Sequence, residues 1–282
     1  MFDSRIKINQ FQSFTTATEI KTPYYNIIMV DGASSFSVDF TQYESTGRHL
    51  LFLAPYQCLS WHDSSTVFAN IIQFHGDFYC IEYHKKEVAC NGILFNNIYQ
   101  QPFVAVSDLV YDEISTIIQK MQILGLSELN SDISIVKSYL QLILALCSKE
   151  KLLNETYFVK EPAKHDDILN FQFLLDKHFL ESKEVEFYAS KLCLSKDAFS
   201  KKIKKNFGKS PSKLIQERIV LEAKKLLHLT YKPIKIIASE LNFEDEFYFS
   251  RYFKKGVGVS PKKFREDVGI SIVAKQSMQN PI

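Results

Sequence analysis

The sequence contains one sixteen-residue phrase twice. Residues 199–214 read FSKKIKKNFGKSPSKL, and residues 249–264, fifty positions later, read FSRYFKKGVGVSPKKF. Eight of the sixteen positions are identical, and the pair Ile203/Phe253 keeps its apolar character. A repeat of this length predicts that the chain folds two copies of one supersecondary unit.

Each copy carries signals that end one helix and begin the next. Gly208 and Gly258 suit the left-handed backbone that commonly ends a helix. Two residues later, SPSK at 210–213 and SPKK at 260–263 combine a capping serine with a proline at the first helical position, where its missing N–H costs nothing. The repeat therefore predicts one helix before each glycine and another after it.

The helix that precedes each glycine is predicted to be amphipathic. Phe199 and Ile203 in the first copy, and Phe249 and Phe253 in the second, are spaced i, i+4 and form an inward face. The outward positions are polar and mostly basic. Each helix thus has one side for the core and one for a polar partner.

A short helical segment and a tight turn lie upstream of each amphipathic helix, at 184–192 and 234–241. Short helix, turn and second helix make the helix-turn-helix pattern, whose second helix enters the major groove of DNA. A predicted helix from Pro211 to His228 joins the copies and is about 27 Å long. This is comparable with the ~34 Å between successive major-groove windows. The pattern predicts that one chain reads two adjacent grooves of double-stranded DNA.

The charge distribution agrees with a nucleic-acid partner for the repeat region. Residues 165–267 hold 21 Lys and Arg against 15 Asp and Glu, a net +6, so the rest of the chain holds 13 against 17, a net −4. A basic excess confined to one part is typical of a nucleic-acid-binding module, and a solvated lysine-rich surface gives the same count. Nonspecific nucleoid or RNA binding would call for a stronger excess.

Residues 237–265, IASELNFEDEFYFSRYFKKGVGVSPKKFR, resemble the second helix-turn-helix unit of the AraC/XylS family of bacterial transcription regulators. The resemblance covers 184–267 and includes a spacing that is one residue longer in the second unit, from Ala238 to Phe249. Asn242 departs from the family pattern, which has glycine there. Asparagine tolerates the positive φ that this turn needs.

The resemblance implies roles for the outward residues of both recognition helices. Base contacts are expected from Lys196, Asp197, Ser200, Lys201, Glu246, Phe247, Ser250 and Arg251. Phosphate contacts are expected from Lys202, Lys204, Lys205, Lys254 and Lys255. The acids at 244–246 repel phosphates if they face DNA, or serve only to start their helix. We therefore expect the first helix-turn-helix to supply most of the affinity for DNA.

The N-terminal part has a different pattern. Residues 24–106 hold short β-branched and aromatic runs, such as YYNIIMV, HLLFL and GILF, separated by polar turns, which is typical of a β-sandwich or a small barrel. Two amphipathic helices follow, at about 107–125 and 131–149.

The second of these helices is apolar on two sides. One stripe comprises Ile133, Val136, Leu140 and Ile143, and the other Ile135, Tyr139, Leu142 and Leu146. A helix with two apolar sides needs two partners, which are the β-domain and a second subunit, unless both stripes are core. We expect dimerisation through Ile133, Val136, Leu140 and Ile143.

These patterns together predict an α+β chain. The expected organisation is a cupin-like sensor and dimerisation domain at 1–150 (β-barrel 20–106, helical pair 107–149), a linker at 151–164, an AraC-type DNA-binding domain at 165–268 and a flexible tail at 269–282. The cupin-like barrel is what the resemblance implies. Four aromatic residues of the predicted β-domain either line an effector pocket or form its core: Tyr25, Phe40, Trp61 and Phe74. Four histidines are too dispersed to be metal ligands: His49, His62, His75 and His84.

The preferred interpretation is a sequence-specific, dimeric transcription regulator that binds promoter DNA, responds to a small effector and works with RNA polymerase. The start is too polar for a signal peptide, the apolar run LQLILALCS is too short for a bilayer, and the five cysteines form no Cys-x-x-Cys pair. We therefore expect a cytoplasmic protein with no cofactor, metal or membrane partner. The alternative is a cupin-type enzyme with an accessory helical domain, for which the sequence has no recognisable nucleophile, acid/base or metal motif.

Overall fold

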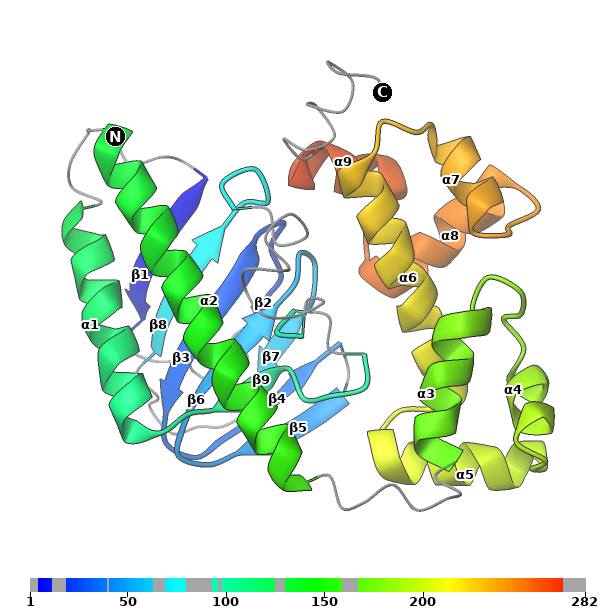
Figure 1. The fold of residues 1–282 in the computed structure, drawn as a ribbon. Coiled ribbons are helices and arrows are strands. Elements are labelled where there is room, and N and C mark those ends of the chain that lie inside the picture. The colour runs from blue at the N-terminus through cyan, green and yellow to red at the C-terminus, as the bar shows by residue number, and fades with distance from the viewer. Residues whose placement is uncertain are drawn as a thin grey trace. The chain divides into compact units, whose positions relative to one another are not determined.

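A computed structural model describes residues 5–11, 19–39, 41–62, 69–79, 93–95, 98–124, 130–158 and 167–270 (Figure 1). The chain divides into two compact units. Unit 1 comprises Met1–Asn97 and Gln101–Phe158, and unit 2 comprises Ile98–Gln100 and Val159–Ile282.

The described strands of unit 1 form two antiparallel sheets. The larger has the order β1-β8-β3-β6-β9, and the smaller β2-β7-β4-β5. The larger sheet is built from β1 (Ile6–Phe11), β3 (Tyr25–Asp31), β6 (Arg48–Leu53), β8 (Ala69–Phe74) and β9 (Phe103–Ala105). The smaller is built from β2 (Glu19–Ile20), β4 (Ser34–Val38), β5 (Thr41–Ser45) and β7 (Leu59–Trp61).

Both faces of the larger sheet are buried, which explains the continuous apolar run in β3. Ile27 and Met29 face the helices of unit 1, whereas Ile28 and Val30 pack with the smaller sheet. Successive side chains of a strand point to opposite faces, so a strand with two covered faces needs apolar residues throughout. The unit therefore has a helical layer and two sheet layers.

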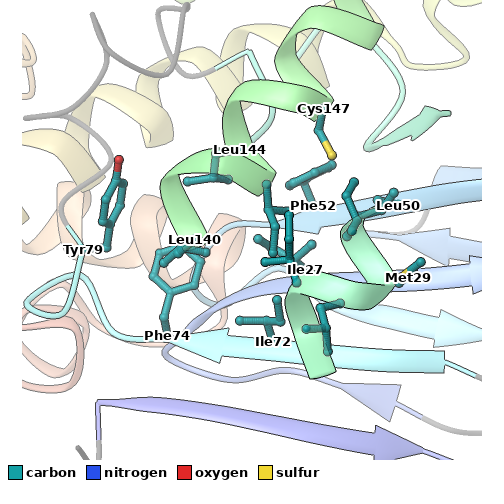
Figure 2. Close-up of a cluster of buried hydrophobic side chains, with 14 of the residues drawn as sticks. Ile27, Met29, Leu50, Phe52, Ile72, Phe74, Tyr79, Leu140, Leu144 and Cys147 are labelled. Atoms are coloured by element: carbon teal, nitrogen blue, oxygen red, sulfur yellow. The ribbon is translucent and has the colours of Figure 1, made fainter. Parts of the chain in front are cut away.

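The helical layer consists of α1 (Asp108–Leu124) and α2 (Asn130–Phe158). Figure 2 shows Leu140, Leu144 and Cys147 of α2 in the cluster with the larger sheet's Ile27 and Phe52. Complete burial raises the pKa of the Cys147 thiol, because the apolar surroundings disfavour the thiolate.

The prediction that α2 dimerises through the face of Ile133, Val136, Leu140 and Ile143 is wrong, because the structure places this face in or against the core of unit 1. Val136, Leu140 and Ile143 are at most 1% exposed and belong to the core of unit 1, and Ile133 packs against that core. A face already covered by the sheet is not available to a second subunit. The opposite stripe is more open, since Ile135 and Leu142 are each 41% exposed.

Other expectations for this part need revision. The described strands form two sheets, so a closed cupin-like barrel is not confirmed. In the expected GILF strand, residues 93–95 form a turn whose Leu94 and Phe95 are buried. α2 continues to Phe158, well into the stretch expected to be a linker. The tail predicted at 269–282 lies outside the described residues from residue 271 onward.

The aromatic residues proposed for a pocket pack in the core where they are described. Trp61 and Phe74 are at most 1% exposed, and Tyr25 stacks on Phe74 with ring centroids 5.2 Å apart. Phe40 lies outside the described residues. These rings hold the layers together.

The histidines occupy separate environments. His49 is fully buried, its Nε2 lies 2.9 Å from Ser45 Oγ, and burial lowers its pKa. His62 Nε2 lies 3.0 Å from Ser37 Oγ, and His75 Nδ1 accepts from the Asp77 N–H. His84 lies outside the described residues. Among the described residues no group of three or more His, Cys, Asp or Glu side chains is placed to hold a metal ion.

Unit 2 is helical. Its elements are α3 (Asp167–His178), α4 (Val185–Lys191), α5 (Lys196–Phe207), α6 (Pro211–Leu229), α7 (Ile234–Glu240), α8 (Glu246–Val257) and α9 (Pro261–Val268). The predicted joining helix is confirmed as α6. Across the part of the chain that the structure describes, no helix has the length and apolar character needed to cross a bilayer.

The buried stripe of α2 predicts the stability of unit 1. Leu140→Ala should destabilise unit 1 by about 2–5 kcal/mol, because it removes buried methyl groups and leaves a cavity. Trp61 is the chain's one tryptophan and lies in the core of unit 1, so its fluorescence during urea unfolding reports on this unit. Leu109→Ala, the same change at a side chain that is 84% exposed on the neighbouring helix α1, is the control and should shift the transition far less; equal shifts would contradict the burial of Leu140.

Candidate nucleic-acid interface

Unit 2 contains the same helix-turn-helix motif twice, α4 with α5 and α7 with α8. In the first turn Cys193 has φ 55° and the Leu194 N–H donates to Ala189 O at 2.9 Å. In the second turn Asn242 has φ 54° and the Phe243 N–H donates to Ala238 O at 3.0 Å. The sequence repeat therefore corresponds to a repeat of backbone conformation.

Capping residues position the start of each second helix. Ser195 Oγ accepts from the Ala198 N–H at the start of α5, and Asp245 Oδ1 accepts from the Tyr248 N–H at 2.7 Å at the start of α8. Asp245 is thus an N-cap, as one of the two interpretations of the acids at 244–246 expects. A side-chain acceptor satisfies an N–H that has no partner in the helix.

The predicted helix ends are confirmed. Gly208 and Gly258 follow α5 and α8 with φ 66° and 94°, in the left-handed region, and their N–H groups donate to Lys204 O and Lys254 O. Ser210 and Ser260 cap α6 and α9. The chain therefore changes direction at the same point in both copies.

The inward stripes of α5 and α8 form the core of unit 2. Phe199, Ile203, Phe249 and Phe253 are at most 1% exposed. Fully burying a side chain of this size contributes about 1.5–3 kcal/mol. Burial of these residues fixes the opposite, polar face of each helix outward.

The proposed DNA-contacting residues lie on these outward faces. Exposed are Lys196, Asp197, Lys201, Phe247 and Arg251, and partly buried are Ser200, Glu246 and Ser250. The proposed phosphate-contacting residues are all exposed: Lys202, Lys204, Lys205, Lys254 and Lys255. Phe247 is 78% exposed, an unusual position for a large aromatic side chain. The individual contacts stay predictions.

Lys196 forms an ion pair that the repeat does not indicate. Its Nζ lies 2.6 Å from Glu186 Oε1 on α4, and the hydrogen bond raises the pKa of Lys196 and lowers that of Glu186. Both side chains are more than half exposed, so the pair is weak and can exchange for a phosphate or base partner.

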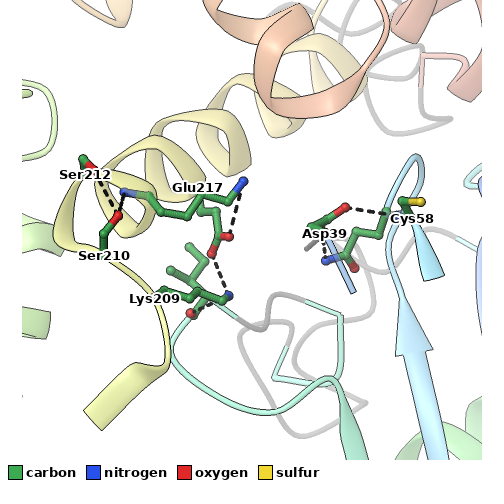
Figure 3. A network of polar contacts seen from close by, with 9 residues as sticks. Asp39, Cys58, Lys209, Ser210, Ser212 and Glu217 are labelled. Carbon is green, nitrogen blue, oxygen red and sulfur yellow. Dashed lines mark hydrogen bonds and ion pairs between the residues drawn. The ribbon is translucent and has the colours of Figure 1, made fainter. Parts of the chain in front are cut away.

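α6 holds the two motifs. It packs against α3 and α5 on one side of the repeat and α7, α8 and α9 on the other. Polar contacts fix its first half: the Arg218 Nε donates to Asp176 Oδ1 at 2.7 Å, and the guanidinium lies 3.8 Å from the centroid of the Phe179 ring. Figure 3 shows Lys209, just before α6, in an ion pair with Glu217 at 2.8 Å.

A glycine allows α8 to approach α6 closely. A Cβ on Gly256 would lie 2.9 Å from Val220 Cγ2 on α6, too close for an ordinary contact. The equivalent position of the first copy is Asn206, which is exposed on α5. The two copies differ here because only the second is packed tightly at this point.

Comparison with known proteins agrees with this geometry. A protein-family model described as a helix-turn-helix domain matches residues 188–267, which run from the middle of α4 to the last turn of α9. Residues 188–267 are an AraC/XylS-type helix-turn-helix domain. The match covers α5, α8 and the α6 helix that joins the two motifs.

The curated relatives match about a third of this chain. The chain is 35% identical over 92 residues to the arabinose operon regulatory protein of Salmonella typhimurium, which covers 33% of this chain and 31% of that protein. The chain thus spans about a third of the length of the curated relatives it matches.

Some solved structures resemble about a third of this chain, and others resemble most of it. The C-terminal domain of AraT from Geobacillus stearothermophilus is 31% identical, with a TM-score of 0.35 over 37% of this chain and 88% of that one. ToxT from Vibrio cholerae is 14% identical, with a TM-score of 0.41 over 95% of this chain and 100% of that one.

The contact at Gly256 predicts an interaction between two positions of the AraC/XylS-type domain. Gly256→Ala should destabilise unit 2 although alanine favours helix by about 1 kcal/mol, because the added methyl meets Val220. In a Val220→Ala background the same substitution should be neutral or stabilising. Hydrogen exchange of α6 and α8 amides measures both effects. Additive effects of the two substitutions would contradict the close approach.

Proposed function

We propose that the chain is a sequence-specific transcription regulator in which α5 and α8 enter two adjacent major grooves of promoter DNA. The observation that carries the proposal is the pair of helix-turn-helix motifs with buried inner faces and exposed polar outer faces, both packed on α6. The relatives that match this domain are named as regulators, including the arabinose operon regulatory protein. On the same ground we propose that the chain is not an enzyme.

The length of α6 supports reading two grooves. Its 19 residues correspond to about 28 Å, close to the ~34 Å between grooves on one side of B-DNA. A shorter helix would place the motifs over one groove. Each exposed face can then contact its own set of base pairs.

The two recognition helices offer different chemistry to DNA. α5 presents Lys196, Lys201 and further lysines, which suit guanine edges and phosphates. α8 begins with Glu246 and the exposed Phe247, which suit cytosine N4 and a thymine methyl. The carboxylates near α8 weaken phosphate binding, so the proposal assigns most of the affinity to the first motif.

The experiment that tests this function is a mobility shift on the DNA upstream of the chain's own gene. The chain should bind this fragment at a much lower protein concentration than a scrambled fragment of the same composition, since specific affinity commonly exceeds nonspecific affinity by about 10³-fold or more. Equal affinity for both fragments would reject sequence-specific regulation.

Two lysines of α5 separate base reading from phosphate binding. Lys201→Ala should change which bases are preferred at one position and cost about 1–3 kcal/mol on the preferred site. Lys205→Ala, one turn further along the same helix, should weaken binding to all sequences alike and reduce the salt dependence. The base preference of each variant is measured by selection from random DNA. If Lys201→Ala selects the same bases as the wild-type chain, Lys201 does not contact bases.

Unit 1 is proposed to control the DNA-binding domain. We propose that it holds a homodimer and responds to a small effector, and that the regulator acts on RNA polymerase; transcription in a purified system with and without candidate effectors tests the last two roles. The exposed face of α2 suits a second subunit, since Ile135 and Leu142 are one heptad apart and each 41% exposed.

The dimer proposal has its own test. Leu142→Glu should convert a dimer to a monomer in sedimentation experiments, because it places a charge in an apolar seam. Ile123→Glu makes the same apolar-to-charged change at a side chain of α1 that is 69% exposed and lies outside the proposed seam, so it is the matched control and should leave the dimer intact. A wild-type chain that sediments as a monomer at micromolar concentration would contradict the proposal.

A further inference from the structure

Asn242 makes a contact that its turn does not require. The turn needs a positive φ at residue 242 and two backbone hydrogen bonds, from the Asn242 N–H to Ser239 O and from the Phe243 N–H to Ala238 O. In the first motif Cys193 forms the same turn with nearly the same φ and the same hydrogen bonds, so the conformation does not depend on an amide side chain. The Asn242 amide is therefore available for another purpose.

That amide reaches the segment that leads into the first motif. Asn242 Nδ2 donates to Leu180 O at 3.1 Å, in the segment between α3 and α4. Glycine, which the family pattern has at this position, could adopt the same backbone but could not make this hydrogen bond. The contact joins residues 62 positions apart in the sequence.

Lys183, in the same segment as Leu180, makes a second hydrogen bond with Asn242, this time as the donor. Its Nζ donates to Asn242 O at 2.6 Å and lies 4.3 Å from the centroid of the Phe243 ring. Burial lowers the pKa of this lysine, and Glu244 opposes that shift. Partial burial strengthens both contacts, because fewer waters compete for the ammonium group.

Phe243 carries the connection into the second recognition helix. Its ring is 6% exposed and packs on Phe249 and Tyr252 of α8, with centroid distances of 5.3 and 5.1 Å. A constraint on residues 242–243 is therefore a constraint on α8. The segment that leads into the first motif is therefore joined to the second motif here, in addition to the packing of both motifs on α6.

We infer that Asn242 and Lys183 are positioning residues that set the distance and angle between the two recognition helices, and so determine which spacing of two half-sites the chain accepts. This inference rests on the proposed function. α6 packs against each motif along that motif's apolar face. The bridge between Leu180–Lys183 and Asn242–Phe243 adds a second attachment that opposes changes in the angle between the motifs.

The test uses variants that keep the turn and remove the bridge. Asn242→Gly loses the amide hydrogen bond, and Lys183→Met keeps the apolar stem but loses the ammonium. Cys193→Gly is the matched control, because it makes the same glycine change at the equivalent turn, where Cys193 takes no part in the bridge. The DNA probe is the fragment that the wild-type chain selects from a random library, with zero, one or two base pairs inserted between its halves.

Wild-type chain and Cys193→Gly should discriminate strongly against the inserted base pairs. In Asn242→Gly this discrimination should fall by about fivefold, the factor that corresponds to one net hydrogen bond, and further in the double variant with Lys183→Met. Affinity for a single half-site should not change. Equal discrimination by Asn242→Gly and Cys193→Gly would overturn the inference.

A measurement without DNA separates this inference from the proposed function. Residual dipolar couplings of the free wild-type chain should fit one alignment tensor for α5 and α8 together. The double variant should need two tensors while each motif keeps its own internal couplings. One common tensor in the double variant would overturn the inference, whereas failure of the wild-type chain to select any DNA would instead reject the proposed function.

Discussion

The packing of two helix-turn-helix motifs on one connecting helix is the constraint on which the proposed function of this molecule depends. α6 buries Leu214, Ile219 and Leu227, and the motifs before and after it pack their apolar faces against it. Each buried side chain of this size contributes about 1.5–3 kcal/mol, so rotating a motif would cost several such contacts. The polar faces of α5 and α8 are therefore held outward by the core rather than by their own charges.

Much of unit 2 could be predicted because its signals are local. Ser210 with Pro211, and the glycine at 208, specify a helix start and a helix end within a few residues, and the same signals recur fifty positions later. The i, i+4 stripe of Phe249 and Phe253 then identifies the buried side. Exposure of the outward residues follows from that periodicity, although it does not identify which of them contact bases.

The remaining features depend on contacts between distant residues. Both stripes of α2 are apolar, and periodicity does not indicate that Leu140 faces the sheet whereas Leu142 faces outward. Likewise, Asn242 looks like a tolerated replacement for glycine until Leu180 is found beside it. The ion pair of Lys196 with Glu186 joins two helices across a turn and has no signature in either helix alone.

Hydroxyl-radical footprinting of the chain on its selected DNA tests the central claim most directly. If α6 holds two readers over successive major grooves, the cleavage pattern should show two protected windows about 10 base pairs apart on one side of the duplex, both lost at high salt. A single window of protection at saturating protein would contradict the account, because it would mean that only one of the two motifs reaches a groove.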